Sequence, residues 1–169
     1  MNNLALSLVG AILIGLGATL TIDLWGLFLK RTFKILAPNY CLVGRWLRHM
    51  PEGTFRHSNI TSAPQKNAEC LVGWIAHYMI GITFAIAFVA WVGNNWLQHP
   101  RLFPAILFGI VTVLMPFFIM QPAFGLGVDA SKTPDPMQSR LRSLMNHTVF
   151  GVSLHLFALL VNWLLWSNA

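Results

Sequence analysis

Four long runs of apolar residues, separated by polar connections, dominate the pattern of this chain. The runs occupy residues 4–29, 70–96, 103–120 and 136–166. Each is long enough, at roughly 1.5 Å per helical residue, to cross about 30 Å of hydrocarbon. The pattern predicts an all-α polytopic membrane protein, in which four transmembrane helices form a bundle and residues 1–169 make a single membrane domain.

Composition and charge agree with this class. Hydrophobic residues make up 56% of the chain and charged residues only 9%. The formal net charge of +6 could suggest nucleic acid, but most basic residues flank the apolar runs. At such positions Lys and Arg set topology and contact anionic lipid. The expected partners are therefore the lipid bilayer and anionic lipid head groups, and no nucleic acid.

The distribution of basic residues predicts the orientation. The connections at 30–69 and 121–135, with the start of the fourth helix, carry almost all Lys and Arg, whereas the remaining connection has Arg101 alone. Both connections are therefore expected in the cytoplasm, with both termini outside. The start MNN lacks a basic residue, so we expect no cleaved signal peptide. The protein is predicted to be a multi-pass protein of the bacterial inner (cytoplasmic) membrane, with periplasmic N- and C-termini.

The first cytoplasmic connection is the most polar part of the chain. Leu42, Val43, Trp46, Leu47 and Met50 fall on one side of a short helical pattern, and Arg45, Arg48 and His49 fall on the other. This arrangement is typical of a short helix lying in the membrane interface.

Cys41 and Cys70 lie on the same predicted side of the membrane, where thiols stay reduced, so no disulfide is expected. No internal repeat is expected either.

Small and polar residues recur at helical spacing in three of the spans and predict close helix contacts. The stripes are Ser7, Ala11, Gly15, Thr19 and Asp23; Gly73, His77, Gly81 and Ala85; and His147, Gly151, His155, Ala158 and Asn162. Pro116 removes a backbone N–H and should kink the third helix near its end. Asp135, Pro136 and Gln138 form an N-cap signature that should begin the fourth helix.

Asp23, His77 and His147 should reach a similar depth below the cytoplasmic surface, counted along each helix. Beneath Arg45, His49, Arg56 and His57, they would form a polar pocket open to the cytoplasm, and intramembrane ionisable groups are candidates for functional sites. The planar guanidinium groups of Arg45 and Arg56 suit a bidentate grip on an anion. Two structural alternatives stay open: the three buried groups could join helices by hydrogen bonds, with His77 the expected partner of Asp23, and the arginines could be topology signals.

Several motifs resemble one known family. GRWLRHMPEGTFRH, GWIAHY, MQPAFGLG, SKTPDP and RLRSLMNHTVFG together are similar to a bacterial membrane-protein family labelled domain of unknown function 2938. The resemblance implies a four-helix inner-membrane protein with no assigned reaction, and at position 129, where this chain has Asp129, a small residue is expected. It marks further candidate positions, namely Asp23, Trp25, Gly44, Arg45, Trp46, His49, Pro51, Gly53, Arg56, His57, His77, Tyr78, Gln121, Pro122, Arg140 and His147.

Three classes of function fit these features. The preferred one is binding or transport of a small anionic molecule or lipid head group at a cytoplasm-facing Arg/His pocket, without a catalytic residue. A haem- or metal-binding redox subunit is an alternative, because histidines of a helix bundle can ligate haem b or a metal ion; the candidates are His77, His147 and His155, of which the deep His155 is expected to be structural. The third is an accessory subunit of a larger membrane complex, with a homodimer or another membrane subunit as partner.

Overall fold

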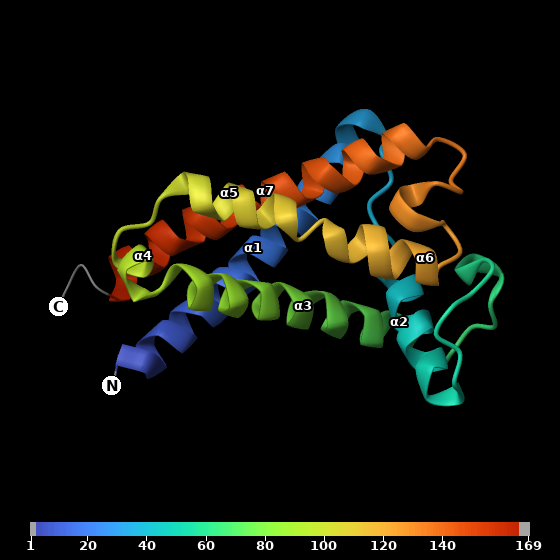
Figure 1. Cartoon of the computed structure of the whole chain (residues 1–169), viewed down its shortest axis with the longest axis horizontal. Helices are drawn as coiled ribbons and strands as arrows, with labels where there is room; N and C mark the ends of the chain where they lie inside the picture. Colours follow the sequence, from blue (N-terminus) through green and yellow to red (C-terminus); the bar gives the residue numbers. More distant parts are fainter. Residues whose placement is uncertain (1–2, 166–169) are drawn as a thin grey trace. The chain divides into compact units, whose positions relative to one another are not determined.

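The protein folds as helices joined by turns and loops, and the computed structural model describes residues 3–165. Within that range the backbone forms no strand. Four of the described segments are long and apolar enough to cross a membrane, which confirms the predicted all-α class and the four spans (Figure 1). They are Leu4–Phe33 in α1 (Asn3–Phe33), Glu69–Val92, which is α3, Leu102–Ala123, and Pro136–Leu164 in α7 (Pro136–Leu165). The predicted end of the fourth helix at residue 166 lies outside the described residues.

The second predicted helix, 70–96, is two helices. α3 ends at Val92, and a short helix, α4 (Asn94–Gln98), follows. Gly93 separates them with φ +78°, a left-handed conformation that glycine adopts without the penalty a Cβ would bring. The amide of Asn162 donates to the carbonyls of Leu97 and Gln98, each at 2.8 Å, and so holds the end of α4.

The third span is interrupted around the predicted proline. α5 (Leu102–Val111) ends one turn before Pro116, and the span continues as η3 (Pro116–Met120), a π-helical segment, and α6 (Gln121–Ala123). Pro116 lacks the N–H that would bond to the carbonyl of Thr112, and that carbonyl accepts from Met115 N instead, at 3.1 Å. The predicted distortion is confirmed, although it begins earlier in the chain than expected.

Two further helices begin at side-chain caps. α7 begins at Pro136, and the carboxylate of Asp135 accepts a hydrogen bond of 3.0 Å from Gln138 N, as the cap signature predicted. The short helix of the first connection is α2 (Tyr40–His49), where Asn39 accepts from Cys41 N. After η1 (Met50–Glu52), Gly53 turns the chain with φ +77°.

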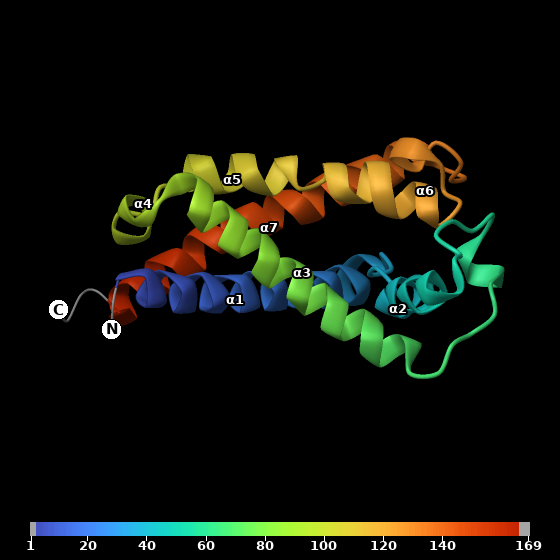
Figure 2. The ribbon, with the colours of Figure 1, turned by 60° about the horizontal axis from the view of Figure 1, so that its bottom comes forward.

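The described chain forms two compact units, and unit 1 contains residues 3–37, Tyr78–Val111 and 146–165. In unit 1 the predicted stripes of small residues are confirmed as helix contacts. A Cβ at Gly15 would lie 2.7 Å from Ile82 Cα, and a Cβ at Gly151 would lie 2.8 Å from Ile106 Cα. α1 thus packs closely on α3, and α7 runs beside α5 (Figures 1 and 2). An apolar core lies between them; its fully buried members include Ile14, Phe88 and Leu154.

Unit 2 contains Pro38–His77 and Thr112–Met145. The two connections that were predicted to share one side of the membrane pack together here. His57 N donates to Ala123 O at 2.8 Å, and Ile60 N donates to Phe124 O at 3.1 Å. Around these bonds lies a small core of Ile60, Ala123 and Phe124, and Leu42, Val43 and Trp46 of α2 pack on it. The first of these connections contains η2 (Ile60–Ser62), and the second contains η4 (Val128–Ala130).

Candidate functional site

The start of α3 crosses α2 at two glycines within unit 2. A Cβ at Gly44 would overlap the carbonyl oxygen of Glu69, and a Cβ at Gly73 would overlap that of Tyr40. These contacts are reciprocal, and the two segments have the same sequence: CLVG occurs at 41–44 and again at 70–73. The expectation of no internal repeat is therefore wrong for this tetrapeptide. The repeat permits backbone-to-backbone contact that only glycine allows.

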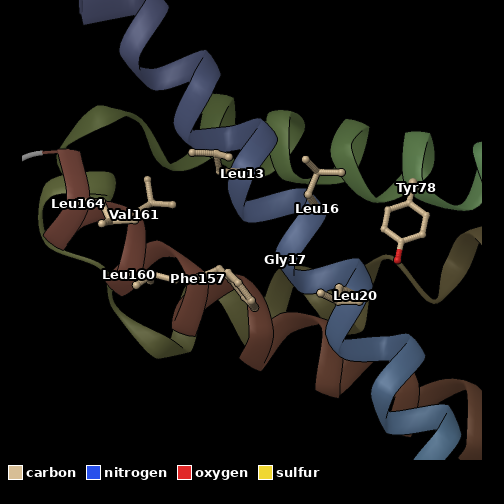
Figure 3. A pocket seen from close by; sticks show the side chains of 9 residues that line it. All are labelled: Leu13, Leu16, Gly17, Leu20, Tyr78, Phe157, Leu160, Val161 and Leu164. Atoms are coloured by element: carbon tan, nitrogen blue, oxygen red, sulfur yellow. The ribbon is translucent and has the colours of Figure 1, made fainter.

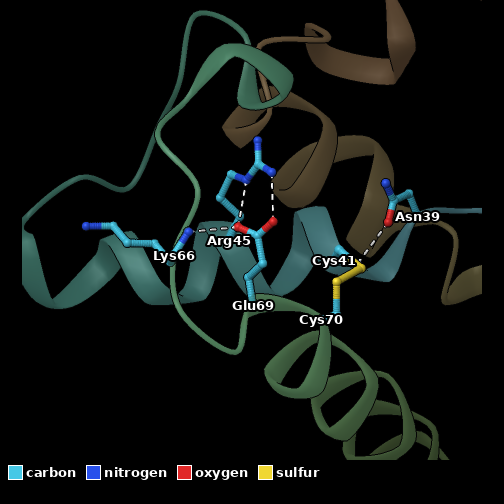
Figure 4. Close-up of a disulfide and its surroundings, with 6 residues drawn as sticks. All are labelled: Asn39, Cys41, Arg45, Lys66, Glu69 and Cys70. Atoms are coloured by element: carbon cyan, nitrogen blue, oxygen red, sulfur yellow. Dashed lines mark hydrogen bonds and ion pairs between the residues drawn. A yellow bond between two sulfur atoms is a disulfide. The ribbon is translucent and has the colours of Figure 1, made fainter.

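Cys41 and Cys70, the first residues of the two CLVG segments, form a disulfide (Figure 4). The prediction of two reduced thiols is wrong for this structure. It followed from the expected compartment alone, whereas the glycine crossing brings the two cysteines together. Cys70 is exposed and Cys41 is half-buried.

Arg45 does not face outward as the amphipathic pattern predicted. Only 6% of it is exposed, and its Nε and Nη2 donate to both carboxylate oxygens of Glu69, at 2.9 and 2.7 Å (Figure 4). Nη1 donates to three carbonyls at 3.2 to 3.3 Å, those of Ile60, Thr61 and Ala63. The hydrogen bonds to Glu69 raise the pKa of the Arg45 guanidinium above its ordinary value. The bidentate grip that was expected for a ligand is made inside the protein.

His49 is also buried, at 6% exposure, so its predicted outward position is wrong as well. Its Nε2 lies 3.0 Å from Pro64 O, and its Nδ1 lies 3.5 Å from a carboxylate oxygen of Glu52. Lys66 pairs with the same carboxylate, and this hydrogen bond lowers the pKa of Glu52. His49 therefore connects α2 to the loop that follows it.

His57 differs from His49 because its ring has an unused nitrogen. Its backbone N–H bonds to Ala123, while its Nε2 is buried and has no hydrogen-bond partner among the described residues. The ring lies edge-on to His49, with centroids 5.0 Å apart. Loss of water contact lowers the pKa of His57, and the nearby His49 lowers it further. The neutral imidazole is thereby favoured.

Gln121 and Arg140 lie in the second half of unit 2. Gln121 is buried; its Nε2 is 3.5 Å from Ser143 Oγ, and its Oε1 has no partner in the described part of the chain. Arg140 Nε contacts the backbone carbonyl of Asp129 at 2.9 Å and its carboxylate at 2.8 Å. Asp129 has φ +52°, a left-handed conformation that Asp tolerates better than most residues. The acidic side chain at position 129 thus fixes Arg140 to the loop.

The remaining cations of unit 2 form a different group, which we call the unpaired cations: Arg48, Arg56, Lys132 and Arg142. Arg142 is half-buried and the other three are exposed, and none has a hydrogen bond or ion pair to another described residue. Each carboxylate of unit 2 is occupied within the unit, since Glu52, Glu69 and Asp129 form ion pairs and Asp135 caps α7. The unpaired cations therefore lack a counter-charge among residues 3–165.

The intramembrane residues are divided between the two units. In unit 1, Asp23 accepts a hydrogen bond of 2.8 Å from the Tyr78 hydroxyl, so the structure gives this carboxylate a partner other than the expected His77. In unit 2, the His77 ring stacks on Tyr40 with centroids 3.8 Å apart. The sequence pattern could not identify Tyr40, an aromatic residue in a different segment.

The candidate metal ligands are also divided between the two units, with His77 in unit 2 and His147 and His155 in unit 1. His147 lies where α7 crosses α5, and a Cβ at Gly109 would be 2.5 Å from the His147 carbonyl oxygen. His155 is half-buried, and its Nδ1 has no partner in the described chain. Within residues 3–165, no three His, Cys, Asp or Glu side chains gather where they could hold one metal ion.

Unit 1 has an apolar groove of about 320 Å³ on its surface. Leu13, Leu16 and Leu20 of α1 form one wall, and α7 residues such as Phe157 and Leu160 form the other. Tyr78 lies at the opposite end of the groove from Leu164 (Figure 3). Because the lining is almost wholly apolar, hydrocarbon chains of the surrounding bilayer suit it better than a polar ligand.

Comparison with known proteins supports the resemblance stated from the motifs. The family described as "Protein of unknown function (DUF2938)" matches residues 12–161. Neither a curated protein nor a solved structure matches the chain. A match over most of the chain identifies its relatives without assigning an activity, and the chain therefore belongs to the DUF2938 family of proteins of unknown function.

Proposed function

We propose that this multi-pass membrane protein binds an anionic molecule, either a lipid head group or a small anion, at the surface of unit 2. The observation that carries the proposal is the charge distribution of this unit. Its four carboxylates are all occupied internally, while Arg48, Arg56, Lys132 and Arg142 have no partner in the described chain. Uncompensated cations next to a bilayer attract anionic head groups by about 1 kcal/mol each.

Arg56 is the best candidate for direct contact. It follows Phe55, which is 59% exposed and whose carbonyl accepts a hydrogen bond of 2.9 Å from Trp46 Nε1. An exposed aromatic ring beside an arginine is suited to the membrane interface, where the ring enters the head-group region and the guanidinium meets phosphate. Trp46 holds this loop to α2, so Arg56 projects from an ordered segment.

Arg45, His49 and Arg140 have a supporting role in this proposal. Their polar atoms are engaged within unit 2, and they position the loops that carry the unpaired cations. His57 Nε2 and Gln121 Oε1 are two of the three buried polar side-chain atoms of unit 2 that have no partner among the described residues, the third being Asp129 Oδ1. An anion carrying a hydroxyl group or a bound water could satisfy the first two. The binding region that we propose is therefore the surface of unit 2 that carries the unpaired cations, in place of the intramembrane histidines that the sequence suggested.

We propose that the protein lies in a bacterial inner membrane with both termini periplasmic. The surface of unit 2 that carries the unpaired cations then faces the cytoplasm. The inner leaflet supplies anionic head groups, and the cytoplasm supplies soluble phosphates and carboxylates. The two sources share the chemistry that arginine recognises.

Lipid retention tests the proposal. The full-length protein, in nanodiscs of mixed phosphatidylglycerol and phosphatidylcholine, should retain phosphatidylglycerol in native mass spectrometry. The double variant Arg48→Gln/Arg56→Gln should lose most of it, whereas Arg101→Gln, which alters an exposed arginine of another connection, should not. Binding of inorganic phosphate in detergent would indicate a small anion instead. Equal retention by all three proteins, without phosphate binding, would reject the proposal.

A further inference from the structure

We propose that Cys41 and Cys70 form a reversible thiol–disulfide site, which exchanges with small thiols or dithiol proteins of the cytoplasm. The structure contains the oxidised pair. Both cysteines belong to the basic first connection or its boundary with α3, and the charge rule directs such a connection to the cytoplasm. Disulfides in that compartment are usually transient and catalytic or redox-sensing, since its thiol pool reduces them.

Access to the bond supports exchange. Cys70 is exposed at the start of α3, so an incoming thiolate can reach its sulfur, whereas Cys41 is half-buried. Each cysteine is the second residue of its helix, α2 or α3. The free N–H groups of a first helical turn stabilise negative charge, and a thiolate leaving or attacking at either position benefits from this.

The two helices stay together without the disulfide. Gly44 and Gly73 bring the backbones into contact, and Arg45 and Glu69 form a bidentate ion pair across the same crossing (Figure 4). Reduction should therefore leave the two thiols side by side, at a high effective concentration. This permits fast closure, which a reversible site requires and a merely structural disulfide does not.

The chemistry balances with thiols as the only co-reactants. A thiolate attacks Cys70 Sγ, a mixed disulfide forms there, and Cys41 leaves as a thiolate. A second thiol attacks the mixed disulfide and releases the small disulfide, so the protein gains two protons and two electrons. The reverse sequence, started by Cys41 or Cys70 on a small disulfide, returns two small thiols and closes the bond.

Thiol trapping in the full-length protein tests this proposal. Purified protein should lose its disulfide in reduced glutathione without denaturant and regain it in oxidised glutathione, as read by maleimide–polyethylene glycol labelling on non-reducing gels. In oxidised glutathione, the variant Cys41→Ser cannot close the disulfide and should instead retain one glutathione on Cys70. In acid-quenched cells the pair should be reduced during growth and oxidised after diamide treatment. Two thiols that never close, or a bond that resists reduced glutathione until the protein unfolds, would overturn the proposal.

The glycine crossing provides a second test. In Gly44→Ala the added methyl group meets the Glu69 carbonyl, so the helices must separate and closure in oxidised glutathione should slow by about tenfold or more. Leu71→Ala, which alters a residue 62% exposed beside Cys70, is the matched control and should close at the wild-type rate. Equal slowing of both variants would contradict the role of the crossing, and the wild-type measurement stays decisive if Gly44→Ala does not fold.

Discussion

Unit 1 and unit 2 are stabilised by different kinds of contact. Unit 1 is a packing of small and apolar residues, with Gly15 on Ile82 and Gly151 on Ile106 as its closest approaches. Unit 2 combines the buried Arg45–Glu69 pair with a disulfide and with backbone hydrogen bonds between two loops. A loop rich in charged residues therefore has fewer side chains free to bind a ligand than its sequence suggests, because several of the charges stabilise the loop itself.

The largest effect should follow from breaking the buried ion pair of unit 2. Glu69→Ala leaves the Arg45 guanidinium buried without its counter-charge, so we expect a loss of about 3–5 kcal/mol in unfolding free energy. Thermal unfolding in detergent, followed by circular dichroism, measures it.

Two variants make this measurement specific. The double variant Arg45→Met/Glu69→Leu removes both charges and should lose less than Glu69→Ala alone. Glu52→Ala, at a carboxylate whose side chain is 55% exposed, should have a much smaller effect. If Glu69→Ala were as mild as Glu52→Ala, the pair would not stabilise unit 2.

An intermediate effect is expected from the helix contact of unit 1. In Gly15→Val the new side chain would meet Ile82 Cα, which is 2.7 Å from the position of a Cβ. Overpacking of this kind costs about 1–3 kcal/mol. Leu16→Val alters the adjacent residue, which is 38% exposed, and serves as the control. Equal melting temperatures for the two variants would show that the helices are not in close contact at Gly15.

The spans and their contacts could be predicted from sequence because each depends on one local pattern. Long apolar runs give the helices, and the four-residue recurrence of Ser7, Ala11 and Gly15 gives the packed face of α1. The end of α3 was missed because Gly93 acts through its left-handed backbone and interrupts an otherwise apolar run.

The candidate site was predicted less well because its contacts join distant segments. Arg45 lies on the polar side of an amphipathic pattern, yet its partner Glu69 is in another helix. Asp23 meets Tyr78, and the nearest sequence cue for that pair was a family motif rather than a spacing. The repeated CLVG was visible in the sequence, but only the crossing shows why it matters.

The smallest expected effect is on the pH dependence of the melting temperature, to which His57 contributes. Burial lowers the pKa of His57 in the folded protein from its ordinary value of 6.5, so the unfolded chain binds a proton first as pH falls. Stability due to the neutral ring is complete above about pH 6.5 and decreases below it. His57→Gln should reduce the fall in melting temperature between pH 7.5 and pH 5.5. An unchanged pH dependence would mean that the ring is not buried.

The proposed orientation, in which unit 2 and its unpaired cations face the cytoplasm, can be measured at a single labelled position. Gln65→Cys, at an exposed residue in a Cys41→Ser/Cys70→Ser background, can be probed with a membrane-impermeant maleimide. If unit 2 faces the cytoplasm, the maleimide should label inside-out vesicles and permeabilised cells, but not intact cells. Efficient labelling in intact cells would place unit 2 on the outer side of the membrane and rule out the proposed orientation.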